Sequence, residues 1–491
     1  MTKFILGGAS ALALMAGAAL AQQSDITVGI QLEPPNLDPT GGAAQAIDSV
    51  LYGNVFEGLT RFMADGSVVP ALAKDWTITE DGLVYTFMLN EGVTFHDGTT
   101  MDAEDVKFSL DRARAEDSTN AQKGLFADIA SVEVIDPMTV QVTLAQPNGS
   151  FLFNMAWGDA VIVAPESIAD IASNPIGTGP YKFDTWVQGD RLEMSAYEGY
   201  WGEQPAISNA TFRFISDPTA AFAAVMAEDV DAFVGFPAPE NLPQFEADPR
   251  FQVLTGNTEG ETILSTNNAD EVLSDLRVRQ AIAHAIDRQA IIDGAMFGYG
   301  TPIGSHFAPH NPDYVDLTGM SAYDPDKARE LLAEAGHAEG LTLSLKLPPP
   351  SYARRGGEII AAQLAEVGIT AEISNLEWAQ WIEEVFTNKD YDLSIVSHTE
   401  PMDIGIYANP DYYFQYDNPE FQALMTTLTE TTDPAARSEI LKQAQEMIAA
   451  DAVNGFLFEL AVSTVAKAGL QGLWVDQPTA AVMLSEVSWA E

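Results

Sequence analysis

The sequence of 491 residues contains no cysteine, and its basic residues are scarce, with 23 Lys and Arg against 71 Asp and Glu. The missing cysteine excludes disulfides, thiolate metal sites, thiol catalysis and lipid attachment through an N-terminal cysteine. The formal net charge of −48 argues against nucleic acid and anionic membrane surfaces as partners. The remaining composition is that of a globular protein, because 46% of the residues are hydrophobic and 9% are aromatic. At roughly 150 residues per domain, the length predicts two or three domains.

The first residues have the composition of an export signal. Lys3 gives a positive start, residues 4–20 are small and apolar, and Ala19-Leu20-Ala21 has the A-x-A form of a cleavage site. A membrane anchor is the alternative, but the stretch is rich in Gly and Ala and falls short of the ~20 strongly apolar residues that a span needs. We therefore expect residues 1–21 to be removed as a signal peptide. The mature protein is then expected to be soluble and periplasmic, without a lipid anchor, and to begin at Gln22.

The first half of the chain is rich in hairpin patterns. Apolar and polar residues alternate on both sides of Asp81-Gly82, and again on both sides of Asp136-Pro137, which predicts two β-hairpins. Asp102 is expected to cap a helix, because apolar residues recur four positions apart after it. The run 177–180 predicts a turn that leads into a strand at 181–186.

From about residue 260 the pattern changes to alternating helices and strands. Two helices are expected, one after a cap at Ser274 or Asp275 and one after Asp324. Further on, the pattern predicts strands at 341–347, 369–373 and 391–396, with helices from about 355 to 368 and from 378 to 386. A strand–helix–strand unit requires a parallel pair of strands with a right-handed crossover. The second half is therefore predicted to be an α/β lobe.

No catalytic motif is recognisable. His96-Asp97-Gly98 is interpreted as a turn, and the six His residues show no metal-ligand spacing. Gly177-Thr178-Gly179 lacks the Lys and Ser/Thr of a phosphate-binding loop, and no Gly-x-Ser-x-Gly is present. The pattern predicts a protein that is not an enzyme and that carries no metal and no cofactor.

One polar and aromatic stretch is a candidate binding loop. The strand predicted at 391–396 runs into His398, Glu400 and Asp403, and Tyr407 and Tyr412 follow. In open α/β sheets, ligands bind beyond the carboxyl ends of the strands, which is where this loop must lie. Asp403 or Glu400 would pair with an ammonium group there, while aromatic rings enclose the rest of a polar organic solute. The alternative is that the tyrosines pack the loop onto the lobe, and the pattern favours neither interpretation.

Two further pairs are weaker candidates. Trp378 and Trp381 lie three residues apart on one predicted helix face, which favours core packing over ligand stacking. Arg354 and Arg355 are prominent in a chain with few bases. They fit a solvated helix start, although arginine also binds carboxylates with two parallel hydrogen bonds.

Several short motifs appear in a fixed order along the chain. They are Glu33–Pro39, Pro70–Ala73 with Trp76, Gly92–Gly98, Ala103–Val106, Phe108–Leu110, Gly177–Tyr181, Val278–Ala281 and Tyr323–Ala328. With this ordered set the chain resembles the solute-binding proteins of peptide/nickel-type ABC importers, solute-binding family 5, from residue 25 to near the C-terminus.

The resemblance implies an α/β, two-lobed periplasmic binding protein fold in which a hinge closes the lobes over a solute. It implies a discontinuous first lobe of residues 22–263, completed by 465–491, and a second lobe of residues 264–464. The chain would cross between the lobes near 264–267 and return near 462–464. An extra subdomain at about 49–154 would belong to the first lobe. The closed protein, expected to be a monomer, would deliver its solute to an inner-membrane permease.

The resemblance does not fix the solute. Dipeptide binders of the family pair the peptide's amino group with an Asp after the strand equivalent to 391–396, and Asp403 is the best match. The Arg that takes the peptide carboxylate is missing from 347–352, where Arg354 or Arg355 would have to substitute. A peptide or peptide-like, amino-bearing compound is the leading expectation. A nickel chelate recognised by His398, a sugar-like solute, and a carboxylate-dependent hydrolase using Glu400 and Asp403 are the alternatives.

Overall fold

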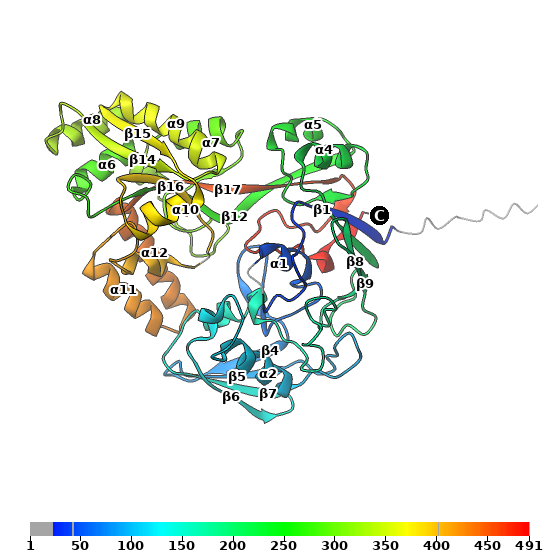
Figure 1. Ribbon diagram of the computed structural model, residues 1–491. Helices are drawn as coiled ribbons and strands as arrows, with labels where there is room; N and C mark the ends of the chain where they lie inside the picture. Colours follow the sequence, from blue (N-terminus) through cyan, green and yellow to red (C-terminus); the bar gives the residue numbers. More distant parts are fainter. Residues whose placement is uncertain (1–22, 42–43, 401, 491) are drawn as a thin grey trace, which may run out of the picture.

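The structure is a computed structural model that describes residues 23–41, 44–400 and 402–490. The expected signal peptide, residues 1–21, lies outside the described residues. Figure 1 shows two lobes joined by a pair of long strands, β12 (Phe251–Thr266) and β17 (Asn454–Lys467). Among the described helices, none combines the length and the apolar character needed to span a membrane.

One sheet of 11 strands runs through both lobes. Its first-lobe strands are β1 (Asp25–Ile30), β8 (Tyr181–Val187), β9 (Arg191–Ala196), β10 (Asn209–Phe214) and β11 (Ala232–Phe233). Its second-lobe strands are β13 (Thr301–Pro302), β14 (Leu341–Leu347), β15 (Ile369–Asn375) and β16 (Leu393–His398). Strand β14 pairs in parallel with both β15 and β16, so the predicted strand–helix–strand unit is confirmed.

Helices surround the sheet of the second lobe. In chain order they are α6 (Leu276–His284), α7 (Arg288–Ala295), η4 (Thr318–Ser321), α8 (Pro325–Glu334), α9 (Ser351–Glu366), α10 (Trp378–Trp381), η5 (Ile382–Thr387), η6 (Ile404–Ala408), α11 (Pro419–Glu430) and α12 (Pro434–Ala450). Asp275 and Asp324 cap α6 and α8 through their side chains, as predicted. Helix α9 begins earlier than the expected residue 355, directly after Pro350. The ring of a proline disfavours helical backbone angles in the residue before it. A helix therefore commonly starts at or just after a proline.

A second sheet has four strands in the order β4-β5-β7-β6. These strands and the short helices around them are β4 (Ala73–Ile78), β5 (Val84–Leu89), β6 (Ile129–Asp136), β7 (Thr139–Leu144), α2 (Ala103–Arg114), η1 (Lys123–Phe126), α3 (Phe151–Asn154) and η2 (Gly158–Ala160). Both predicted hairpins are confirmed, and Asp102 caps α2 in a reciprocal capping box.

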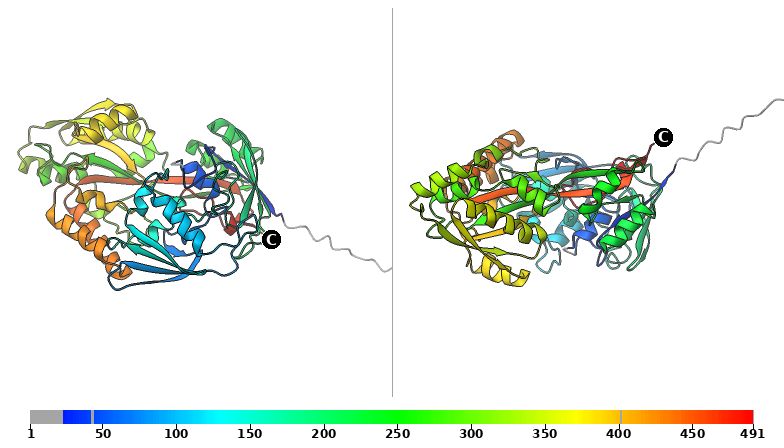
Figure 2. Two further views of the ribbon diagram at one scale, coloured as in Figure 1. Left: turned by 60° about the horizontal axis from the view of Figure 1, so that its bottom comes forward. Right: turned by 90° about the horizontal axis from the view of Figure 1, so that it is seen from above.

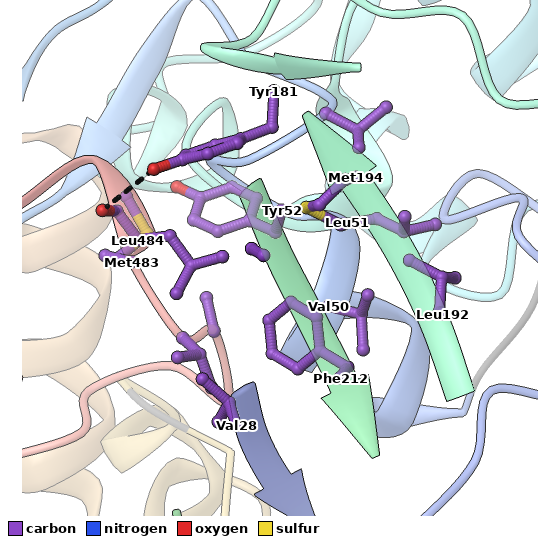
Figure 3. Packing of buried hydrophobic residues seen from close by; sticks show 14 of the residues in the cluster. Val28, Val50, Leu51, Tyr52, Tyr181, Leu192, Met194, Phe212, Met483 and Leu484 are labelled. Atoms are coloured by element: carbon purple, nitrogen blue, oxygen red, sulfur yellow. Dashed lines mark hydrogen bonds between the residues drawn. The ribbon is translucent and has the colours of Figure 1, made fainter. Parts of the chain in front are cut away.

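The core of the first lobe contains segments from both ends of the chain. Figure 3 shows Val28 of β1 and Phe212 of β10 packing with Met483 and Leu484, and the hydroxyl of Tyr181 donates to the carbonyl oxygen of Leu484 at 3.4 Å. The remaining elements of this lobe are α1 (Gln45–Leu51), β2 (Thr60–Phe62), β3 (Val68–Pro70), α4 (Pro218–Met226), η3 (Pro239–Asn241), α5 (Leu242–Glu246), β18 (Leu470–Gln471), η7 (Leu484–Glu486) and β19 (Ser488–Trp489).

The two joining strands change register between the lobes. Strand β12 pairs regularly with β17 up to Asn257, which faces Ala461, and pairing resumes at Glu261, which faces Glu459. The segment 258–260 of β12 therefore bulges opposite a single residue of β17, and such a bulge bends and twists a strand pair. From Glu261 onward, β12 also pairs with β16 of the second lobe.

The lobes also touch at a second place, away from the joining strands. Figure 2 shows the α11–α12 pair beside the four-stranded sheet. Arg437 of α12 donates to the hydroxyl of Ser150 at 3.2 Å, and its guanidinium packs against Gly149, where a Cβ would lie 1.8 Å from Nη1. A side chain at this position would meet both the arginine and the backbone carbonyl oxygen of Thr431, 2.6 Å from the Cβ, which favours glycine.

Candidate ligand-binding site

A cavity of about 360 Å³ lies between the lobes. Its first-lobe wall comes from α1 and from residues 157–159 at the start of η2. The bulge 258–260 of β12 and the segment 477–480 contribute further lining, and the second lobe adds Thr399 and Glu400. This volume is at the lower end of the range for pockets that enclose small organic molecules.

The cavity is acidic. Its lining includes the carboxylates of Asp48, Asp159, Glu259 and Glu400, and none of the described lining residues is Lys or Arg. Glu259 accepts a hydrogen bond from Nε2 of the buried His310 at 2.6 Å, so one of the four carboxylates already has a partner. Carboxylates that converge in a partly enclosed space favour a cationic ligand.

The predicted binding loop lies at the carboxyl edge of the sheet. Strand β16 runs parallel to β14 and ends at His398, two residues later than expected, and the loop follows it directly. Of the side chains predicted in this loop, the exposed Glu400 lines the cavity. Asp403 lies deeper, at the start of η6.

Asp403 is part of a buried ion-pair cluster. Nε2 of His306 lies 2.5 Å from Oδ1 of Asp403, and Nδ1 of the same ring lies 2.8 Å from Oε1 of Glu261. Burial alone would lower the pKa of His306, but the charges of Glu261 and Asp403 outweigh it and raise that pKa to about 10. The imidazole is therefore protonated at neutral pH and holds the two carboxylates together.

A second acid lies next to this cluster without a partner. Glu459 is fully buried, and neither of its carboxylate oxygens has a hydrogen-bond partner among the described residues. Burial, together with the charges of Glu261 and Glu259, raises its pKa well above the ordinary value. Burial also raises the pKa of Glu261, to about 8. Glu459 is therefore largely uncharged at neutral pH, whereas Glu261 shares a proton with His306, whose Nδ1 lies 2.8 Å from its Oε1.

The predicted aromatic residues divide between the core and the loop. Tyr407 is fully buried, its ring stacks on Phe414 with centroids 4.7 Å apart, and its hydroxyl accepts from the Asn454 amide at 3.2 Å. His398 is buried and shares a 3.0 Å hydrogen bond with the hydroxyl of Tyr413. Tyr412 is partly exposed, and its ring meets that of Phe414 edge to face. In this conformation Tyr407 packs the loop onto the lobe.

The other predicted pairs, Trp378 with Trp381 and Arg354 with Arg355, do not line the cavity. Trp381 is buried and its indole N–H donates to Ser394 at 2.9 Å, whereas Trp378 is 42% exposed. Arg354 donates to the carbonyl oxygen of Leu376 at 3.0 Å and pairs with Glu377 at 3.1 Å. Arg355 lies over the ring of Phe297, 5.4 Å from its centroid.

Two groups of side chains have ligand atoms close enough to share a cation. They are Glu261, His306 and Asp403, and His398, Glu400 and Asp403, with the atoms of each group within 4.8 Å of one another. In the first group both ring nitrogens of His306 are occupied by carboxylates, so the group is an ion-pair cluster. In the second, burial lowers the pKa of His398, and the ring is therefore neutral, as metal coordination requires.

Sequence reasoning missed several of these residues. Asp48 and Asp159 lie 111 positions apart on short elements that show no periodicity, and nothing in the sequence links them. The joining strands did carry a signal in the sequence. The polar run 257–262 interrupts the apolar pattern of one strand, and Glu459 is an isolated acid in the apolar run of the other. Polar residues at positions that should be buried often mark a functional or strained site.

Comparison with known proteins gives the context of this geometry. Residues 67–418 match the bacterial extracellular solute-binding proteins, family 5, middle region. The glutathione-binding protein GsiB of Salmonella paratyphi A is 30% identical over 510 aligned residues, which cover 98% of this chain and 98% of that protein.

Solved structures agree with the fold described above. The periplasmic murein tripeptide-binding protein MppA, in its unliganded open form, matches with a TM-score of 0.86 at 20% identity, covering 96% of this chain and 98% of MppA. DppA from Helicobacter pylori, in complex with the peptide STSA, matches with a TM-score of 0.74 at 23% identity, covering 96% of this chain and 99% of that one. The predicted two-lobed binding-protein fold is confirmed.

Proposed function

The chain belongs to the bacterial extracellular solute-binding proteins of family 5, which are transport proteins and not enzymes, and we propose that it captures a small, amino-bearing, peptide-like solute between its lobes. The observation that carries the proposal is the interlobe cavity, which is lined by four carboxylates and by no Lys or Arg among its described residues. An ammonium group entering such a cavity replaces repulsion between acids with charge-assisted hydrogen bonds.

Two comparisons support a peptide-like solute. The relative from Salmonella paratyphi A is named for glutathione, and the Helicobacter pylori structure holds a short peptide. Both of these ligands have a free amino group. We propose Glu400, which lines the cavity, and Asp403, which lies behind it, as the side chains that pair with that group, with Tyr412 completing the loop. Arg354 and Arg355 stay candidates for a carboxylate that reaches α9.

The same proposal includes a hinge. We propose lobes of 22–263 with 465–491 and of 264–464, with the extra subdomain at about 49–154. The bulge 258–260 of β12 supports a hinge there, because the regular ladder is interrupted between the two lobes. The closed, monomeric protein would hand its solute to an inner-membrane permease from the periplasm.

The solute itself is the first test. Mass spectrometry of the compound retained by the purified protein should recover an amino-bearing, peptide-like molecule, chemically unchanged. Recovery of a compound without any amino group, or its conversion to a product during incubation, would contradict the proposal.

Asp403→Asn tests the second-lobe contact. Losing a charge-assisted hydrogen bond should weaken binding of the recovered solute by about ten- to a hundredfold in calorimetry. Because Asp403 also pairs with His306, the variant should unfold at a lower temperature. His306→Gln is the matched control, since it breaks the same pair without removing the carboxylate. If both variants bind the solute equally well, Asp403 does not contact it.

A metal chelate is the second candidate, because the neutral His398 lies with Glu400 and Asp403 within coordination distance. Calorimetry with Ni²⁺ in the presence of free histidine separates the two candidates. Binding that is abolished by His398→Gln would favour the chelate.

A further inference from the structure

We infer that Asp48, Asp159 and the ring of Trp157 form a subsite for a second cationic group of the solute, an ammonium or a guanidinium, on the first-lobe wall of the cavity. The inference rests on the proposed function and deepens it. The solute would be a basic, peptide-like compound with one cation toward the second lobe and another toward the first.

The position of the two carboxylates is the first argument. Asp48 lies in the middle of α1 and Asp159 lies in η2, and both line the interlobe cavity. Asp159 is only 7% exposed, yet its Oδ1 has no hydrogen-bond partner among the described residues. A buried carboxylate oxygen without a partner is costly, and such atoms in native proteins call for an explanation such as a bound group.

The electrostatics are the second argument. Burial raises the pKa of Asp48 to about 7, and the charge of Asp159 adds to the effect. Burial likewise raises the pKa of Asp159 to about 6. No cationic side chain contributes to either shift among the described residues. A ligand cation would restore the charged form of both carboxylates.

The backbone beside Asp48 is shaped around its carboxylate. A Cβ at Gly158 would lie 2.2 Å from Oδ1 of Asp48, so only glycine fits between Trp157 and Asp159. Trp157 and Phe62 line the same cavity, and their rings meet edge to face with centroids 6.5 Å apart. The indole N–H of Trp157 also has no partner among the described residues.

These aromatic rings select the kind of cation. A tryptophan face attracts ammonium and guanidinium groups through its quadrupole, particularly where water is partly excluded. A hard metal ion prefers oxygen ligands and gains little from an aromatic face. The cavity volume of about 360 Å³ also suits an organic molecule better than a bare ion.

The test uses calorimetry with two dipeptides of similar size, Ala-Lys and Ala-norleucine, which differ in the terminal ammonium of the side chain. The parent protein should bind Ala-Lys at least about tenfold more tightly. Asp159→Asn and Asp48→Asn should remove most of this preference. Asp229→Asn is the matched control, because Asp229 is an exposed first-lobe aspartate outside the cavity lining, and it should leave the preference unchanged.

The possible outcomes distinguish failure of the cation subsite from failure of the proposed peptide-like solute. Equal affinity for both dipeptides, or a preference that survives Asp159→Asn, overturns the subsite while leaving a peptide-like solute in place. Absence of binding by both dipeptides at ~1 mM overturns the basic, peptide-like solute class. Recovery of a retained solute that has an amino group but no second cation overturns the inference and supports the proposed function.

Discussion

Glu261 of β12 and Glu459 of β17 lie directly opposite each other across the ladder that joins the two lobes, and both side chains are buried. The only cation close to them among the described residues is His306, which contacts Glu261 and is itself shared with Asp403. Folding therefore buries these acids close to one another. Burial and their mutual repulsion raise their pKa values, so that they keep protons in the folded state. This has consequences that can be measured without knowing the solute.

The first prediction is that the empty protein loses stability as the pH rises above about 6.5. Glu261 and Asp48 have folded pKa values raised from 4.5 to about 8 and from 3.8 to about 7, and that of His306 is raised from 6.5 to about 10. In this range the folded state binds more protons than the unfolded state, so the free energy of unfolding falls with pH. One such proton is worth about 1.4 kcal/mol per pH unit.

Chemical denaturation at pH 6.5 and pH 9 checks this prediction. Between about pH 4.5 and pH 6.5 the raised pKa values of the buried acids already make stability fall with pH, and the lowered pKa values of His96 and His398 oppose this trend only in part. Stability that is constant or rising between pH 6.5 and pH 9 would contradict the assignment of retained protons to the buried acids.

The second prediction isolates Glu459. Glu459→Gln replaces a buried carboxyl with an uncharged group of the same shape, so the variant should equal its parent near pH 4, where the unfolded carboxyl is largely protonated as well. At pH 9 it should be more stable, with a melting temperature higher by at least about 2 °C. The exposed Glu198→Gln serves as control and should show no pH-dependent difference. A Glu459→Gln variant that tracks the parent at both pH values would mean that folding does not raise the pKa of Glu459.

The third prediction concerns Tyr407. Its ring is fully buried, so Tyr407→Ala should lower stability by about 3–5 kcal/mol, as large-to-small substitutions of core aromatics do. Tyr407→Phe keeps the ring and loses only the bond from Asn454, so it should cost about 1 kcal/mol. Urea denaturation measures both. Solute affinity that is unchanged in the phenylalanine variant supports a packing role, whereas a large loss of affinity there would place the hydroxyl on the solute.

The fourth prediction concerns motion. Because the ladder that joins the lobes is interrupted at the bulge 258–260, we expect solute binding to bring the lobes together. Small-angle scattering should show a smaller radius of gyration upon saturation with the recovered solute. Asp403→Asn at the same solute concentration is expected to show less compaction. A radius that does not change at saturation would count against closure.

Much of the fold could be predicted from the sequence, and the reasons are local. The Asp-Gly and Asp-Pro turns, the caps at Asp275 and Asp324, and the leucines of β14 each act over a few residues, so their patterns are visible in the chain. The ordered motifs then identified the family. The position of the loop after β16 also followed from the sequence, because a parallel sheet fixes which edge it occupies.

The contacts within the site could not be predicted, because they depend on residues far apart in the chain. His306 reaches Asp403 across 97 positions, and no periodicity connects them. Asp48 and Asp159 meet only because α1 and η2 form one wall of the cavity. The burial of Tyr407 could not be predicted for another reason. A tyrosine in a loop gives the same sequence pattern whether its ring faces solvent or the core.

The first lobe is built from both ends of the chain, and this dictates the order in which it can fold. Strand β1 must wait for β10, almost 200 residues later, and the core around Val28 and Phe212 is completed only by Met483 and Leu484. The second lobe, by contrast, can gather most of its helices and strands from one continuous stretch. Contacts of such high sequence separation form slowly, so the first lobe stays unfinished until the segment around Met483 and Leu484 has joined its core.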